Sequence, residues 1–154
     1  DKDTKDLDAS HTIGDYIAKK GITHPVIIGP DAGAKELAKA VATPHGFDYD
    51  VLEKRRVSGE EVEITPRALS VEGKNVIIVD DIISTGGTIA EAATMLKAQG
   101  AAEIHVTCIH GLFVQNATLR MFKAGVKEII ATDTIESAFS LISIAKIVAE
   151  ALKR

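Results

Sequence analysis

Two adjacent aspartates followed by a loop of hydroxyl-bearing residues and glycines are the part of this sequence best suited to chemistry. Asp80 and Asp81 end an aliphatic run, and the loop beyond them contains Ser84, Thr85, Gly86, Gly87 and Thr88. Ionised carboxylates only accept hydrogen bonds, so two side by side require a metal, cations or a ligand with several donors, such as a sugar diol. Glycines let the backbone approach a ligand, and free N–H groups at a helix N-terminus favour an anion. The segment can therefore hold a diol at one end and a phosphate at the other, as in a pentose 5-phosphate.

The common nucleotide-binding loops fit this segment less well. It contains neither the Gly-Lys-Ser/Thr of a Walker A loop nor the spacing GxGxxG. The simplest alternative is an ordinary strand–turn–helix connection with polar turn residues. Two acids together with five consecutive hydroxyl-bearing residues or glycines exceed what a turn needs, which favours a ligand site.

A short basic cluster forms the second group of candidate residues. In an extended chain, alternation places Lys54 and Arg56 on one face and Arg55 on the other. Arginine can fork two phosphate oxygens, and lysine acts as a point charge, so Lys54 and Arg56 are candidates for contacting phosphates. The alternative is a solvated basic turn paired with the glutamates that follow it.

A third candidate is Asp31, which follows Pro30 in a predicted turn. An unpaired acid would repel phosphate, and a bound Mg²⁺ would remove that repulsion. The alternative is an Asx turn, in which the side chain bonds to the backbone nearby.

Alternating strands and helices must position these residues. Apolar runs at 26–29, 76–79 and 103–109 indicate buried strands, and helical spacing appears at 34–41 and 89–98. This order is typical of a parallel α/β sheet, in which ligands collect at the carboxyl ends of the strands. The remaining expectations are helices at 10–21 and 117–123, strands at 47–53 and 127–131, a strand edge and helix within 142–152, and a long mobile loop after a strand end within 55–70.

Composition narrows the class of protein. The chain has 154 residues, of which 45% are hydrophobic and 26% charged, as expected for one globular domain with a core. A net charge of −4 argues against a nucleic-acid partner, and no apolar run approaches the roughly 18 residues of a membrane helix. With Cys108 alone no internal disulfide can form, so we expect a reducing, cytoplasmic location and an inert, buried thiol.

Several motifs resemble one family. The stretch VIIVDDIISTGGTI, Val76–Ile89, resembles the phosphoribosyl-diphosphate-binding signature of the type I phosphoribosyltransferase fold. GPDAGA, Gly29–Ala34, is similar to the pyrophosphate loop of the ribose-phosphate pyrophosphokinases, and EKRR, at 53–56, resembles the start of their flexible catalytic loop. Ala34 departs from the glycine that usually ends the first of these loops and would be strained if that position required a positive φ. Ser84 stands where many members carry aspartate.

The resemblance implies a three-layer α/β/α fold and the transfer of a diphosphate from ATP to O1 of ribose 5-phosphate, with Mg²⁺, releasing AMP. It assigns catalysis to Lys54 and Arg56. Asp80, Asp81 and the loop from Ser84 to Thr88 would bind ribose 5-phosphate. Asp31, Ala32 and Gly33 would form the diphosphate loop, with Asp31 as a metal ligand.

Members of that family contain two similar halves, and this chain resembles the C-terminal one. We therefore expect a single domain over 1–154, with 1–8 as a linker from an N-terminal half, and a homo-oligomer. One rival is a phosphoribosyltransferase of nucleotide salvage, which needs a base-binding subdomain that this chain does not obviously contain. The other is a non-catalytic regulatory module, which would be expected to lose the cations or the acidic pair.

Overall fold

A seven-stranded sheet organises the protein. The computed structural model describes residues 5–58 and 61–153, without the side chains of 55–62. The strand order is β3-β2-β1-β4-β5-β6-β7, and every neighbouring pair is parallel except β2 and β3. The strands are β1 Pro25–Gly29, β2 Asp48–Ser58, β3 Glu61–Pro66, β4 Asn75–Ile83, β5 Glu103–Gly111, β6 Glu128–Thr132 and β7 Ser140–Ile142.

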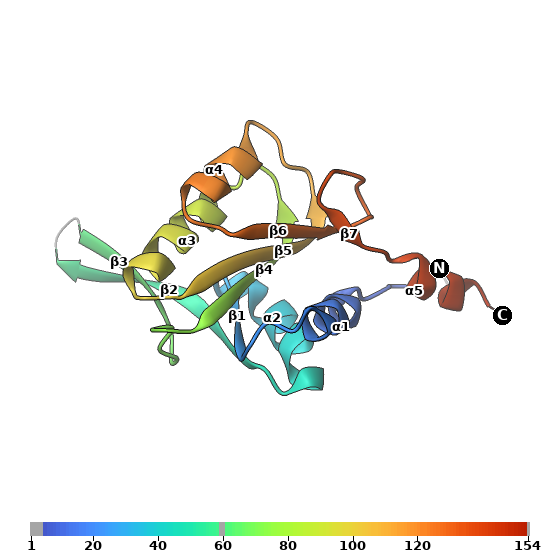
Figure 1. The fold of residues 1–154 in the computed structure, drawn as a ribbon, viewed down its shortest axis with the longest axis horizontal. Helices are drawn as coiled ribbons and strands as arrows, with labels where there is room; N and C mark the ends of the chain where they lie inside the picture. The colour runs from blue at the N-terminus through green and yellow to red at the C-terminus, as the bar shows by residue number, and fades with distance from the viewer. Residues whose placement is uncertain (1–4, 59–60, 154) are drawn as a thin grey trace.

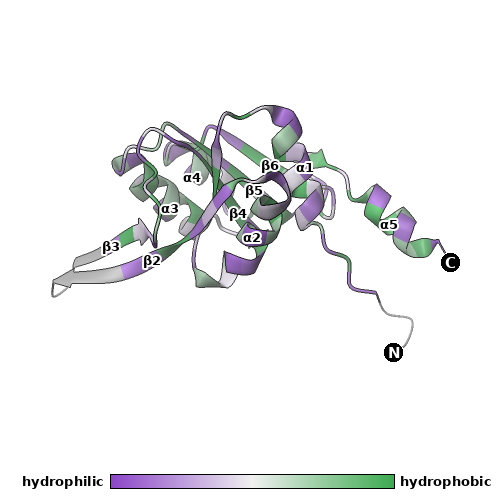
Figure 2. Cartoon of the chain, turned by 90° about the horizontal axis from the view of Figure 1, so that it is seen from below, coloured by the Kyte–Doolittle hydropathy of each residue, from purple (hydrophilic) through white to green (hydrophobic). Residues whose placement is uncertain are grey.

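Helices cover both faces of this sheet. Helices α1 (Ser10–Lys20) and α2 (Lys35–Ala42) pack on one face, and α3 (Gly87–Ala98) and α4 (Ala117–Lys123) pack on the other (Figure 1). The predicted α/β/α layering is therefore confirmed. The last helix, α5 (Ala145–Leu152), extends away from the layers (Figures 1 and 2).

The apolar run of β4 shows why a continuous hydrophobic stretch becomes a central strand. Val76 and Ile78 belong to the core beneath α3 and α4, whereas Ile77 and Val79 belong to the core beneath α1 and α2. Side chains alternate between faces along a strand, so a strand covered on both sides needs apolar residues at every position. All four are fully buried.

The segment after β2 differs from the expectation. The predicted strand end agrees with β2, which runs on to Ser58, but the predicted long loop is wrong for 61–66, where β3 pairs antiparallel with β2. We call this pair the β2–β3 arm; it projects from the body in Figures 1 and 2. Leu52 and Ile64 bury their side chains in the core and anchor its base. Along β3 the apolar residues Val62 and Ile64 alternate with polar ones, so the sequence does contain a strand signal there, which the expectation of a loop overlooked.

No helix in the described part of the chain is long and apolar enough to cross a membrane.

Candidate functional site

The two aspartates lie inside β4, whereas we expected them just beyond its end. Asp80 pairs in register with Cys108 of β5, and β4 continues to Ile83. Asp80 is half-buried and Asp81 is exposed. The side-chain charges did not end the strand because its backbone groups still find partners on β5.

A hollow of about 390 Å³, which we call the acidic hollow, lies at the carboxyl ends of β1 and β4. The parallel pairing of these strands brings the turn after β1 beside the end of β4. Three aspartates and the apolar or small residues between them line it: Asp31, Gly33, Ala34, Leu37, Asp80, Asp81 and Ile82. Two of the three predicted segments thus meet at one edge of the sheet.

The pKa of Asp80 shows how the surroundings of this hollow act on a carboxylate. This pKa is raised from 3.8 to about 7. Burial is the main cause, and a hydrogen bond with Asp81 and the charges of Asp81 and Asp31 act in the same direction, whereas the Asp81 N–H that donates to Asp80 at 2.9 Å lowers the pKa. None of the residues that line the hollow is basic. The site therefore favours a ligand that brings hydrogen-bond donors or positive charge.

The donor set fits a magnesium ion held jointly with a ligand. Within 5–58 and 61–153, no three His, Cys, Asp or Glu side chains are grouped so as to hold a metal by themselves. Mg²⁺ takes hard oxygen ligands, usually one or two carboxylates completed by water and substrate phosphates. Carboxylates at the edge of an open hollow are compatible with that mode of binding.

Asp31 makes the Asx turn considered as the alternative to a metal ligand. One carboxylate oxygen accepts the Gly33 N–H at 2.8 Å, at the start of the 3₁₀ turn Ala32–Ala34. That bond occupies a single oxygen, so the turn and a metal contact are compatible. Ala34 has φ −87°, so its departure from glycine causes no strain. Gly29, by contrast, must stay small, since a Cβ there would lie 3.0 Å from the Ala34 Cβ.

A second hollow, of about 180 Å³, adjoins the first, and we call it the glycine hollow. It shares Asp80 and Ile82 with the acidic hollow and is otherwise lined by Ile83, Ser84, Thr85, Gly86, Gly87, Thr88 and Ile89. Gly86 adopts the left-handed conformation, φ 70°, immediately before α3, and no side chain caps that helix. The first N–H groups of α3 therefore remain available to an anion.

Of the basic candidates, only Lys54 has a described side chain, and it does not join these hollows. Lys54 lies inside β2, and its ammonium is 3.4 Å from the Glu91 carboxylate of α3. It lines neither hollow. Arg56 is placed only as a strand residue opposite Val62, because its side chain lies outside the described residues.

Two further residues complete the surroundings. Cys108 is fully buried, and burial together with the charge of Asp80 raises its pKa to about 12, as expected of an inert core thiol. Arg120 of α4 donates to the Thr85 carbonyl. Sequence reasoning missed Arg120, because a lone arginine on a short helix carries no signal that it contacts a loop 35 residues away.

Comparison with known proteins adds a family match. The model of the phosphoribosyl transferase domain matches residues 6–149. A ribose-phosphate pyrophosphokinase of Methanosarcina acetivorans is 54% identical over 148 residues, which make up 96% of this chain and 52% of that protein. The ribose-phosphate pyrophosphokinase 2 of Archaeoglobus fulgidus is 49% identical over 146 residues, or 95% of this chain and 53% of that protein. The chain thus spans about half the length of the curated relatives it matches.

Solved structures agree with this fold. The phosphoribosylpyrophosphate synthetase of Mycobacterium smegmatis superimposes with a TM-score of 0.75 at 26% identity, covering 92% of this chain and 48% of that one. An adenine phosphoribosyl transferase of Trypanosoma brucei gives 0.61 at 22% identity, covering 84% and 66%. The second likeness is one of fold.

Proposed function

The chain belongs to the phosphoribosyl transferase domain family, and we propose that it is the ribose 5-phosphate-binding half of a ribose-phosphate pyrophosphokinase. The whole enzyme would transfer a diphosphate from ATP to O1 of ribose 5-phosphate, giving phosphoribosyl diphosphate and AMP. The observation that carries the proposal is the junction of the acidic and glycine hollows at Asp80. At this junction the carboxylates that can accept hydrogen bonds from sugar hydroxyls lie next to the hydroxyl and N–H groups that can donate to a phosphate.

Ribose 5-phosphate would lie across this junction. Asp80 and Asp81 would accept hydrogen bonds from the ribose hydroxyls, because carboxylates are pure acceptors. The hydroxyls and backbone N–H groups of Ser84–Thr88 would hold the 5-phosphate, with help from the positive end of α3. The left-handed Gly86 supports this assignment, since it turns the backbone into the helix without a side chain in the way.

Asp31 would bind Mg²⁺ at the acidic hollow, and Ala32 and Gly33 would complete the diphosphate loop. When bound, Mg²⁺ supplies positive charge against the transferred diphosphate. The raised pKa of Asp80 supports a cation in this region, because it reflects burial first and the charges of Asp81 and Asp31 second, and no basic residue among those that line the hollow compensates them. In phosphoryl transfer the protein mainly positions groups and stabilises charge.

Lys54 and Arg56 would supply that charge from the β2–β3 arm. The Lys54–Glu91 pair is weak, since both side chains are more than half exposed, at 65% and 53%. Exposed pairs contribute at most about 1 kcal/mol. Lys54 can therefore leave Glu91 and reach the phosphates when the nucleotide binds.

The length of the relatives and the exposed helix α5 support two further partners, an N-terminal half and other copies of the chain. An N-terminal half of the same polypeptide, joined through 1–8, would provide most ATP contacts. None of the residues of α5 is buried, and Leu152 is 76% exposed, which supports a surface covered by another part of the enzyme. We also propose a cytoplasmic homo-oligomer without a nucleic-acid or membrane partner.

Incubating the full-length enzyme with ATP, Mg²⁺ and ribose 5-phosphate tests the proposal. AMP should appear only when all three are present. Base-dependent release of diphosphate from phosphoribosyl diphosphate, without AMP formation, would identify a phosphoribosyltransferase instead. Neither activity would point to a regulatory module.

A further inference from the structure

The glycine hollow is braced from behind by the segment between β5 and α4. The N–H groups of Leu112 and Phe113 donate to the Ile83 carbonyl at 3.0 and 3.2 Å, and the Val114 N–H donates to the Ser84 carbonyl at 2.9 Å. Two consecutive carbonyls of the hollow are therefore held from the α4 side.

Arg120 extends this support to the next carbonyl. Its Nη1 donates to the Thr85 carbonyl, and its Nη2 donates to the Gln115 carbonyl at 3.3 Å. One guanidinium thus ties the hollow to the segment behind it, which its planar fork of donors suits. Gly86 fits closely at the same place, because a Cβ on it would lie 3.2 Å from the Ala117 carbonyl oxygen.

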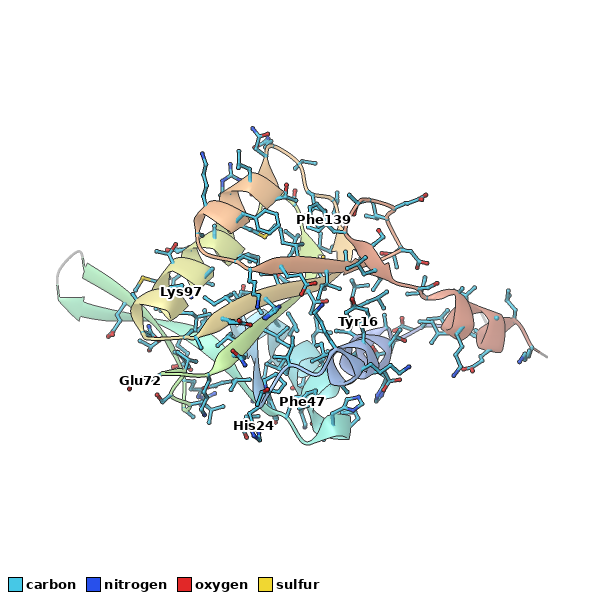
Figure 3. All side chains as sticks on the ribbon, viewed as in Figure 1. Tyr16, His24, Phe47, Glu72, Lys97 and Phe139 are labelled. Atoms are coloured by element: carbon cyan, nitrogen blue, oxygen red, sulfur yellow. The ribbon has the colours of Figure 1, made fainter. Side chains whose placement is uncertain are left out.

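The bracing segment itself is held in an unusual conformation. Phe113, Gln115 and Asn116 have φ values of 48°, 52° and 60°. Side-chain-bearing residues keep the left-handed conformation only where surrounding contacts impose it, and such residues cluster at functional sites. One contact is the Phe113 ring, which meets Phe139 edge-on at 5.5 Å; Phe139 is labelled in Figure 3.

Peptide geometry links these contacts to the ligand. In a trans peptide the carbonyl and the following N–H point in opposite directions. Holding the carbonyls of Ile83, Ser84 and Thr85 toward the α4 side therefore turns the next three N–H groups away from it. Within the described chain, the Thr85 and Gly86 N–H groups donate to no backbone carbonyl. They remain available to an anion.

We propose that Arg120 is a positioning residue for the 5-phosphate, and that it acts through the Thr85 carbonyl rather than by touching the ligand. Arg120 does not line the glycine hollow. By fixing the Thr85–Gly86 peptide it keeps a carbonyl oxygen away from the phosphate and presents the Gly86 N–H to it. This role rests on the proposed function, because it requires a phosphate in the glycine hollow.

Three variants of the full-length protein test this role. Arg120→Met removes the fork, Arg120→Lys keeps the charge with a single donor group, and Lys123→Met is the control on an exposed side chain of the same helix. The first measurement is amide hydrogen exchange over 83–89 without ligand. The second is the dissociation constant for ribose 5-phosphate and for ribose, with the KM for ATP.

We expect faster exchange over 83–89 in Arg120→Met and Arg120→Lys and no change in Lys123→Met. The dissociation constant for ribose 5-phosphate should rise about tenfold in Arg120→Met, as for the loss of one charge-assisted hydrogen bond. Arg120→Lys should lie between Arg120→Met and wild type. Ribose affinity and the KM for ATP should stay within about twofold, because the proposed effect is confined to the phosphate.

Unchanged exchange and unchanged ribose 5-phosphate affinity in Arg120→Met would overturn the role. Wild-type affinity for ribose 5-phosphate in Arg120→Lys, together with a loss in Arg120→Met, would also overturn the role. The positive charge alone, without the fork of donors, would then explain the effect. If the unmodified protein binds ribose 5-phosphate no better than ribose, the proposed function fails, and the phosphate role of Arg120 fails with it. Exchange in the ligand-free variants would still show whether Arg120 holds the loop.

Discussion

The ammonium group of Lys54 lies 3.4 Å from the carboxylate of Glu91, and this contact joins the β2–β3 arm to the first turns of α3. Lys54 is therefore positioned beside the helix whose N-terminus borders the glycine hollow, but outside the hollow itself. A weak, exposed pair of this kind can hold a reactive cation close to a site and release it to a ligand with greater negative charge.

Lys54→Ala should reduce kcat by roughly 100-fold, because a cation that meets charge developing in the transition state typically contributes that much. The free energy of unfolding should stay within about 0.5 kcal/mol of wild type, since the side chain is exposed. Glu91→Gln is the matched control and should retain wild-type kcat. Near-normal turnover of Lys54→Ala, measured as AMP release, would remove Lys54 from the catalytic assignment.

Asp31→Asn should raise the Mg²⁺ concentration for half-maximal activity by about tenfold, because it replaces a charged ligand with a neutral one. The amide oxygen can still accept the Gly33 N–H, so the turn should survive. Asp48→Asn, at an exposed position on β2, serves as the control. The same Mg²⁺ requirement in Asp31→Asn and wild type would contradict a metal role.

Asp50→Ala should lower the free energy of unfolding by about 3 kcal/mol. Its buried carboxylate accepts the N–H groups of Val51, Ala68 and Leu69 at 2.8, 2.6 and 2.9 Å, and so ties the segment after β3 to β2. Removing the carboxylate leaves buried donors without a partner. Urea denaturation measures the loss, and Asp48→Ala should change stability by less than about 0.5 kcal/mol. A comparably small effect of Asp50→Ala would show that water satisfies those donors.

Glu128 should make stability depend on pH in the acid range. Burial raises its pKa, but hydrogen bonds with Lys20 and His105 outweigh burial and leave the pKa below 4.5. A depressed pKa contributes stability above the unfolded value that is lost as pH falls through the folded one. The difference in unfolding free energy between wild type and Glu128→Gln should therefore be constant from pH 7 to about 5 and shrink below the ordinary value of 4.5. A constant difference down to pH 3 would contradict the shift.

Local pattern determined much of this protein. The apolar run 76–79 predicts a central strand because a strand covered on both faces must be apolar at every position. The glycines and hydroxyls after it predict an anion site because their small size and free donors act locally. The helices α1 to α4 were likewise predicted, α2 and α3 from helical spacing and α4 with the same bounds.

Only the tertiary structure decided which backbones pair and which distant side chains meet. Hydrophobic periodicity reports which side chains are buried and not which backbones pair, so the continuation of β4 through the aspartates was not predicted. The alternation of Val62 and Ile64 with polar residues is a strand signal, but only the structure showed that β3 pairs with β2. The contacts of Lys54 with Glu91 and of Arg120 with Thr85 join residues 37 and 35 positions apart. Such contacts depend on how helices dock on the sheet, and the residue types at either end are the same as on any solvated surface.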